Sequence, residues 1–311
     1  MRRILVTAIS GNVSNGILKT LQETEDEIFG CDIYDFPVGM DKVKVYWKSE
    51  LAVTSGYINS LIEKCEEYQI SHLIPANEVE IEVINRNINR FHSKGIRVLI
   101  NKPQIIDCFL DKYKTYQSLK NINGIFVPET FRYCDFIADG RQYIVKLNRS
   151  CGSKYFKLIT TKEEIDSLDI CPDEYIIQEY LPDAQEEYTV GVFSDGENVY
   201  TIIFKRKLEH GYTSFVELVY DESISESARL IAQEIGLRGY INIQLRKQGG
   251  KNFIFEINPR ISGTVYFRHL LEFKDVLWWL DMIDGREIAY APKYKKAVGM
   301  RELTEKFVML E

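Results

Sequence analysis

Apolar and polar residues alternate along two neighbouring stretches in the last third of the chain. The second stretch, residues 253–258, is expected to form a strand, because successive side chains of a strand point to opposite faces. One face would carry Phe253, Phe255 and Ile257, and the other would carry Ile254, Glu256 and Asn258. Pro259 then ends the strand, since proline cannot donate to the ladder.

The first stretch, residues 240–246, alternates in the same way, and a glycine-containing hairpin signal at 248–251 separates the two. The loop length decides the pairing. A two-residue loop would place Gln244 opposite Phe255, on the wrong face, whereas a three-residue loop at 249–251 would place it opposite Glu256. Three-residue hairpin loops with glycine are common, so we expect the second register.

In that register Gln244, Glu256 and Asn258 share one face and form a candidate metal site. A carboxylate with amide oxygens is the kind of hard-oxygen set that suits Mg²⁺. Arg260 adds a fixed positive charge just beyond the strand. A Glu-x-Asn pattern on its own is also typical of the polar outer face of an edge strand. The rest of the chain therefore has to decide between the two interpretations.

Residues 1–105 alternate between apolar strand-like runs, at 3–9, 27–32, 72–75 and 97–100, and helical patterns such as 57–68. This order predicts an α/β domain with a parallel sheet. Asn12, Asn77 and Glu78 fall at predicted carboxyl ends of strands, where either helix capping or substrate contact would explain them. The turn from Gly11 to Gly16 lacks the three-glycine dinucleotide pattern, which makes nicotinamide binding the weaker alternative.

After residue 105, several charged residues lie within or at the ends of predicted helices and strands. Lys112 opens a helix, and Lys146 lies in a strand that runs into a polar loop at 148–154, an arrangement suited to a phosphate clamp. Glu179 ends the next apolar strand, and Glu186 and Glu187 follow it. Taken singly, the helix lysine and the two later acids are equally compatible with a solvated surface.

Composition narrows the function classes. The 311 residues are 45% hydrophobic and 27% charged, which is ordinary for a globular protein large enough for two or three domains. The net charge of −7 has mixed signs along the chain, which argues against a nucleic-acid surface. Six scattered cysteines indicate reduced thiols and a cytoplasmic setting, and no apolar run approaches the length of a membrane span.

Taken in order, these segments resemble the ATP-grasp superfamily. The resemblance rests on Asp111-Lys112 and the following Gly-Ile-x-Val-Pro-Glu-Thr, on Lys146 with its loop, on the hinge at 178–182, and on Gln244 with Glu256-x-Asn258-Pro259-Arg260. Gln244 and the run Asn258-Pro259-Arg260 resemble the carbamoyl-phosphate-synthetase-like branch of this superfamily. The resemblance implies an α/β and α+β architecture with three parts: a pre-ATP-grasp domain at 1–105, a lid subdomain at 106–185, and a C-terminal antiparallel lobe with the metal site at 186–311.

The resemblance also implies roles for single residues, with ATP and Mg²⁺ as cofactors and Mn²⁺ as an alternative metal. The residues expected to contact ATP are Lys112, Lys146, Gly152, Ser153, the backbone of Glu179, Tyr180 and Leu181, Glu187 with the ribose, and Arg206. Gln244, Glu256 and Asn258 would bind the metal, and Arg260 would act in catalysis. The phosphate loop departs from the family pattern at Leu147, Ser150 and Tyr155, so it has fewer glycines than usual.

The implied activity is ligation of a small-molecule carboxylate to an amine through an acylphosphate, with neither nucleic acid nor membrane as partner and a homodimer as the default assembly. No protein nucleophile is required, because phosphoryl transfer depends mostly on positioning and electrostatics. Two alternatives remain: a non-catalytic ATP-binding or assembly protein, which the glycine-poor loop favours, and a nicotinamide-dependent oxidoreductase that uses the first domain.

Overall fold

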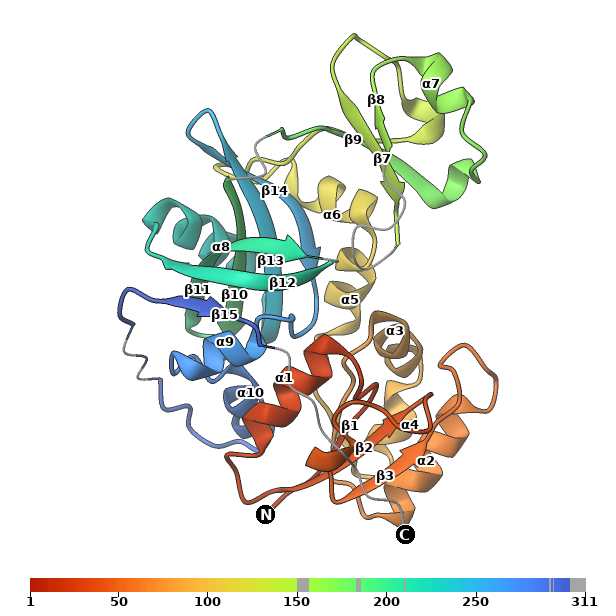
Figure 1. Ribbon diagram of the computed structural model, residues 1–311, viewed down its shortest axis with the longest axis vertical. Helices are drawn as coiled ribbons and strands as arrows, with labels where there is room; N and C mark the ends of the chain where they lie inside the picture. Colours follow the sequence, from red (N-terminus) through yellow and green to blue (C-terminus); the bar gives the residue numbers. More distant parts are fainter. Residues whose placement is uncertain (150–156, 183–185, 210, 291, 293, 303–311) are drawn as a thin grey trace.

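The computed structural model describes residues 1–149, 157–182, 186–209, 211–290, 292 and 294–302, and arranges them around three sheets (Figure 1). Each sheet has its own strand order and its own helices. No helix within this described part of the chain has the length and apolar character needed to cross a membrane.

The N-terminal sheet has five parallel strands in the order β3-β2-β1-β4-β5, which confirms the predicted parallel α/β layer. Its elements are β1 (Arg3–Val6), α1 (Asn12–Leu21), β2 (Glu27–Asp32), η1 (Met40–Lys42), β3 (Val45–Lys48), α2 (Tyr57–Glu67), β4 (His72–Ile74), α3 (Glu78–Arg86), α4 (Ile88–His92) and β5 (Arg97–Val98). The chain moves outward from β1 to β3 and then returns to β4 on the other side. The switch point, where open α/β sheets usually bind ligands, therefore lies between β1 and β4.

The largest sheet has six antiparallel strands in the order β14-β13-β10-β11-β12-β15. The strands are β10 (Glu187–Ser194), β11 (Val199–Glu209), β12 (Tyr212–Val219), β13 (Gly239–Gln248), β14 (Lys251–Asn258) and β15 (Val298–Met300). Helices α5 (Pro103–Phe109), α6 (Lys112–Leu119) and α8 (Glu222–Glu234) cover one face, where alternate apolar residues such as Ile241, Ile243 and Leu245 are buried.

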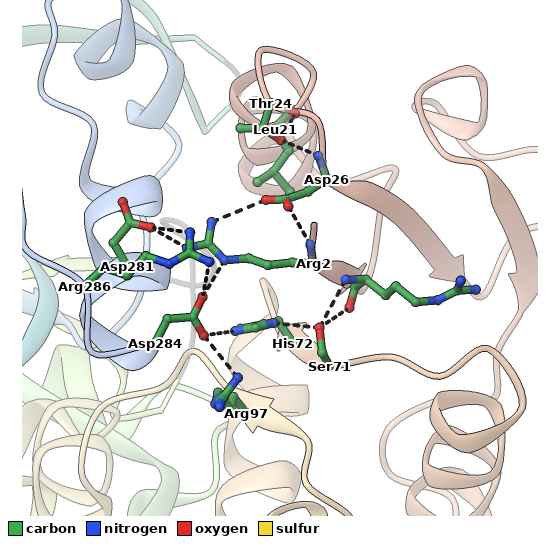
Figure 2. Close-up of polar contacts among 11 residues, drawn as sticks. Arg2, Leu21, Thr24, Asp26, Ser71, His72, Arg97, Asp281, Asp284 and Arg286 are labelled. Atoms are coloured by element: carbon green, nitrogen blue, oxygen red, sulfur yellow. Dashed lines mark hydrogen bonds and ion pairs between the residues drawn. The ribbon is translucent and has the colours of Figure 1, made fainter.

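The opposite face of this sheet shares a hydrophobic core with the N-terminal sheet. Ile4 and Leu18 belong to the same buried cluster as Phe204 and Trp279, with α9 (Val265–Leu270) and α10 (Asp275–Ile283) packed between the two sheets. A polar network extends this contact, since Arg2 before β1 pairs with carboxylates near the end of α10 (Figure 2). The two sheets thus form one packed body.

The third sheet, in the order β6-β9-β7-β8, projects away from that body in Figure 1 and has a small core of its own. It comprises β6 (Thr130–Arg132), η2 (Tyr133–Asp135), β7 (Tyr143–Leu147), β8 (Lys157–Ile159), α7 (Lys162–Asp166), η3 (Pro172–Glu174) and β9 (Tyr175–Glu179). The predicted domain limits at residues 105 and 185 remain predictions. The packing of α5 and α6 onto β14 groups these two helices with the large sheet rather than with the small one.

The β13–β14 hairpin has the predicted pairing of Gln244 with Glu256, but its loop is shorter than predicted and a bulge compensates for the difference. Gln244 lies opposite Glu256, yet Gln248 pairs with Lys251, so the loop is Gly249-Gly250 and the expected three-residue loop is wrong. Both glycines have positive φ, 55° and 75°, as a tight two-residue hairpin turn requires. A β-bulge at the step from Gln244 to Leu245 supplies the missing residue and restores the register.

The bulge also corrects the expected division of side chains between the two faces of β14. Ile254 is buried in the same core cluster as Ile257, three residues later, instead of sharing a face with Glu256. Phe255, in turn, lies on the polar face, where Lys146 and Arg246 contact its ring at 5.9 and 5.6 Å. Strict alternation fails here because a bulge sets two residues of one strand opposite one residue of its partner.

Candidate active site

The polar face of the large sheet brings the three predicted metal ligands together. Gln244 is directly opposite Glu256, and Asn258 follows Glu256 by two residues on the same strand face. Asn258 is almost fully buried, whereas Glu256 is partly exposed. One carboxylate and two amide oxygens on adjacent strands fit the oxygen preference of Mg²⁺.

The side chain of Gln244 also contacts an arginine, in addition to lying beside Glu256. Its Oε1 accepts a 2.7 Å hydrogen bond from Arg206, whose other contacts are with Glu187. An amide oxygen has two lone pairs, so Gln244 would have to share Oε1 between the guanidinium and a cation. Within the part of the chain that the structure describes, no three His, Cys, Asp or Glu side chains gather in a metal-binding group, so a metal here would rely on amides.

Glu187 lies between two arginines. Its Oε1 accepts from Arg206 at 2.8 Å, and its Oε2 accepts from Arg246 at 2.9 Å, while its residue exposure is only 8%. The alternative of a solvated acidic loop is therefore wrong for Glu187, the first residue of β10. The neighbouring Glu186 is more exposed and pairs with Lys205 at 2.6 Å.

Two lysines, one from the small sheet and one from α6, lie near the same polar face. Lys146 in β7 donates a 2.7 Å hydrogen bond to Oε1 of Gln178 in β9. Desolvation is the main cause that lowers the pKa of Lys146 to about 7; the charges of Lys112 and Arg246 act in the same direction, and the nearby Glu256 carboxylate opposes them. These electrostatic effects show that Lys146 is near Glu256 of β14 and near Lys112 of α6.

The N-terminus of α6 is held against the residues that follow β7. Asp111 caps the helix by accepting from the backbone of Lys114 at 2.9 Å. The backbone N–H of Lys112 donates to the carbonyl of Asn148, and that of Tyr113 donates to its side-chain oxygen at 3.0 Å. The predicted phosphate-loop residues Gly152 and Ser153 lie outside the described residues.

The predicted hinge follows β9. The side chain of Glu179 accepts from the backbone of Glu129 at 3.2 Å and lies 3.6 Å from Arg141, on the side of the small sheet. The backbone N–H of Tyr180 donates to Gln142 at 3.0 Å. The carbonyl of Leu181 accepts from Arg246, which links the hinge to the polar face of the large sheet.

Arg260 points away from the large sheet toward the N-terminal domain. Its Nε and Nη2 donate to Oε1 of Glu78 at 3.0 and 2.8 Å, and its Nη1 donates to the carbonyl of Ile261. Glu78 is the first residue of α3, directly after β4, and Asn77 is the cap of that helix, accepting from Val79 at 2.8 Å. Capping therefore explains Asn77, whereas Glu78 pairs with the predicted catalytic arginine.

The turn after Arg260 rests on a buried ion pair. Arg268 is fully buried and pairs with Asp275 at 2.6 Å. The same guanidinium donates to the hydroxyls of Ser262 at 2.8 Å and Thr264 at 2.7 Å, two residues of the segment that leads from Arg260 into α9. Arg268 is thus a positioning residue for this turn.

Several polar residues near the candidate site were not predicted from the sequence. Arg246 follows Gln244 by two residues and so shares its strand face, and strand parity alone would have found it. The pattern of alternation does not reveal Gln178 or Asn148. Gln178 accepts from Lys146 and Asn148 accepts from the start of α6, and both partners lie in other segments of the chain. The pairing of Glu78 with Arg260, 182 residues apart, likewise had no local signature.

Residues 172–306 match the family model described as ATP-grasp in the biosynthetic pathway with Ter operon. The chain is 25% identical over 200 residues to the tyramine--L-glutamate ligase of Methanocaldococcus fervens, covering 62% of this chain and 59% of that relative. It is 23% identical over 196 residues to the carbamoyl phosphate synthase large chain of Pseudomonas aeruginosa, covering 56% of this chain and 18% of that relative. Less than two thirds of each of these relatives is therefore covered.

A solved structure shows the same fold over nearly the whole chain. The biotin carboxylase domain of Hydrogenobacter thermophilus 2-oxoglutarate carboxylase, in complex with MgADP, ADP and bicarbonate, superposes with a TM-score of 0.74 at 14% identity. The superposition covers 94% of this chain and 72% of that one. The three-sheet architecture and the order of the motifs agree with this match: the chain has the fold of that domain, its residues 172–306 are similar to an ATP-grasp family model, and it is similar in sequence to the carbamoyl phosphate synthase large chain.

Proposed function

We propose that this protein is an ATP- and Mg²⁺-dependent ligase that joins a small-molecule carboxylate to an amine and releases ADP. The observation that carries the proposal is the proximity of Lys146, from the small sheet, to the face of the large sheet that holds Glu256. Cations from one side and metal-binding oxygens from the other are what a triphosphate requires.

In this proposal ATP binds along this face. Lys112 and Lys146 contact the phosphates, with Gly152 and Ser153 in the adjoining loop and Arg206 on the large sheet. The backbone of the hinge from Glu179 through Tyr180 to Leu181 contacts adenine. Glu187 contacts the ribose, and to do so it must give up one of the four hydrogen bonds that Arg206 and Arg246 donate to its two oxygens, because a carboxylate has about four lone-pair sites.

Glu256 and Asn258, with Gln244 sharing its oxygen, would hold Mg²⁺, and Mn²⁺ would suit the same oxygen ligands. The bound metal would offset the charge of the triphosphate during transfer. Arg260 stands beyond the metal-binding strand, where its guanidinium would hold the carboxylate and stabilise the acylphosphate.

The reaction balances without a protein nucleophile. A carboxylate oxygen of the substrate attacks the γ-phosphorus, an O–P bond forms, and the bond to the leaving ADP breaks. The amine nitrogen then attacks the acyl carbon, a C–N bond forms, and the C–O bond to inorganic phosphate breaks with loss of a proton from nitrogen. Lys146 and Arg206 would offset the charge on the transferred phosphoryl group, and Arg260 would hold the acyl end.

We further propose that the enzyme acts in the cytoplasm, where ATP is supplied, and that it is a homodimer. Cys31, Cys65, Cys108, Cys134 and Cys171 are free thiols in the structure, as a reducing compartment would keep them. The biotin carboxylase domain that shares the fold is described as a dimer, which supports the second point.

A second candidate is a non-catalytic ATP-binding protein. The hydrogen bond from Arg206 to Gln244 favours it, since this cation occupies an oxygen that the metal would need. Leu147, at the position where the family loop has proline, favours it as well. Such a protein would bind ATP at the same site and release no ADP.

ADP release with panels of carboxylates and amines tests the proposal. We expect substrate-dependent ADP formation, abolished in Glu256→Ala because this variant removes the one carboxylate of the metal set. Glu234→Ala, at an exposed position at the end of α8, is the control and should retain activity. Unchanged ADP formation in Glu256→Ala would refute the ligase.

A further inference from the structure

The ion pair between Glu78 and Arg260 joins the segment after β14 to the start of α3. Glu78 follows β4, and Asn12, which follows the β1 turn, lies beside Gly263 of the Arg260 turn. These contacts place Arg260 at the carboxyl ends of β1 and β4, which flank the switch point of the N-terminal sheet. Ligands of open α/β sheets bind at this position.

Both partners of the pair are largely removed from water. The side-chain exposures of Arg260 and Glu78 are 15% and 13%, and both Nε and Nη2 of the guanidinium donate to the same carboxylate oxygen. Separating such a pair costs free energy unless each charge gains a new partner, because a poorly hydrated unpaired charge is strongly disfavoured.

This requirement selects among substrates by their charge. A plain carboxylate that binds Arg260 displaces Glu78 and leaves it without a cation. A plain amine that binds Glu78 leaves Arg260 without an anion. A molecule that carries both groups replaces one internal ion pair by two ion pairs with the ligand, and no charge is left unpaired.

From this exchange we propose, building on the ligase function proposed above, that the carboxylate substrate is a zwitterionic amino acid. Its carboxylate pairs with Arg260, and its ammonium group pairs with Glu78. Glu78 is then a specificity-determining residue that holds the arginine in the empty site and admits only a ligand that supplies both charges. Asn12, the first residue of α1, lies beside Gly263 of the same turn and could contact this ligand.

Equilibrium binding tests this proposal without requiring turnover. The probes are the proteinogenic amino acids in L and D forms, each compared by calorimetry with its deamino acid, for example alanine with propionate and glutamate with glutarate, in the presence of MgADP. We expect at least one amino acid to bind about 10-fold or more tightly than its deamino acid, as a lost charged hydrogen bond implies. Equal binding of each pair, or no binding by any amino acid, would overturn the proposal.

The Glu78→Gln variant gives a second test, because it should change the affinities for the amino acid and for its deamino acid in opposite directions. Affinity for the amino acid should fall about 10-fold, because the ammonium loses its partner, whereas affinity for the deamino acid should rise, because Arg260 is released. Glu78→Asp, which keeps the charge, should retain part of the preference, and Glu63→Gln on the exposed face of α2 should leave both affinities unchanged. Equal losses for both probes would assign Glu78 a structural role only.

The ligase function is scored separately, by trapping the acylphosphate with hydroxylamine and measuring ADP. Selective binding of an amino acid without ADP release would support the charge-exchange site and refute the ligase. ADP release that is equally fast with a deamino acid, and unchanged in Glu78→Gln, would support the ligase and refute the zwitterion site.

Discussion

The ammonium group of Lys146 donates a 2.7 Å hydrogen bond to Oε1 of Gln178 on the neighbouring strand β9. Gln178 is itself fixed, since its amide nitrogen donates to Thr130 at 2.9 Å and its side chain is buried. The lysine side chain is therefore held in a set position. Because burial lowers its pKa to about 7, a large share of the group is neutral at physiological pH until a negative ligand arrives.

ATP binding at pH 8 should consequently take up a proton. The triphosphate favours the charged form of Lys146 and raises its pKa, so the complex holds a proton that the free protein lacks. Calorimetry in buffers of different ionisation enthalpy measures this uptake, and ATP affinity should weaken as the pH rises above about 7. Lys146→Arg should abolish the uptake, since arginine stays charged, whereas Lys112→Arg should preserve it. Equal uptake in wild type and Lys146→Arg would show that another group titrates.

Glu187 offers a test of the arginine pair that surrounds it. Glu187→Gln leaves Arg206 and Arg246 facing a neutral amide in a poorly hydrated site, so we expect a loss of about 2–4 kcal/mol in the free energy of unfolding. Glu186→Gln is the matched control, because its pair with Lys205 is more exposed and should contribute less than about 1 kcal/mol. Urea denaturation of the two variants decides the matter, and similar losses in both would contradict a special role for the buried carboxylate.

The sequence was sufficient for the features that depend on local periodicity. Alternation predicted the buried face of β13, and the βα order predicted the parallel sheet, because both patterns are set by the local sequence. The opposition of Gln244 and Glu256 was also correct, although the predicted loop was not. The spacing of three between Ile254 and Ile257 was the available signal of the bulge, since strict alternation cannot bury both.

Contacts between distant segments could not be predicted in the same way. Arg260 reaches Glu78 across 182 residues, and Lys146 comes within electrostatic range of Glu256 only because β7 of the small sheet lies near β14 of the large one. Such pairs depend on how whole sheets pack, and their residues look like ordinary surface charges in the sequence. The roles assigned to Lys112, Lys146 and Glu256 in nucleotide and metal binding remain predictions that the variants above test.

The buried pair of Arg268 and Asp275 should matter for stability and for activity. Asp275→Asn leaves the fully buried guanidinium uncompensated, and we expect a loss of about 3–5 kcal/mol in the free energy of unfolding. Replacing both partners by apolar residues, as in Arg268→Met with Asp275→Leu, should recover much of that loss. The double variant should still have reduced kcat, because Ser262 and Thr264 lose the donor that fixes the Arg260 turn. Denaturation and steady-state kinetics on both variants separate the two effects, and full activity in the double variant would exclude a positioning role.

Asp284 joins the N-terminal sheet to the end of α10 and should make the protein sensitive to acid (Figure 2). It accepts from Arg2 at 2.7 Å and from Arg97 at 3.1 Å, and lies 2.9 Å from Nε2 of His72. Burial acts to raise the pKa of Asp284, but the hydrogen bonds from Arg2 and His72 outweigh it and leave the pKa below its usual value of 3.8. Burial also lowers the pKa of His72 below 6.5, against the opposing hydrogen bond to Asp284.

Both shifts have the same consequence, because in acid the unfolded chain binds more protons at these sites than the folded protein does. The contribution of His72 to the free energy of unfolding is complete above pH 6.5 and is lost as the pH falls through its lowered pKa. The contribution of Asp284 is complete above pH 3.8 and is lost as the pH falls through its own lowered pKa. Asp284→Asn should therefore cost about 2–4 kcal/mol at pH 7 and progressively less below pH 4. Asp281→Asn is the control, since Asp281 is 30% exposed against 9% for Asp284 and should contribute about 1 kcal/mol or less. Urea denaturation between pH 3 and pH 7 measures both variants, and a cost for Asp284→Asn that stays constant over this range would show that its charge does not stabilise the junction.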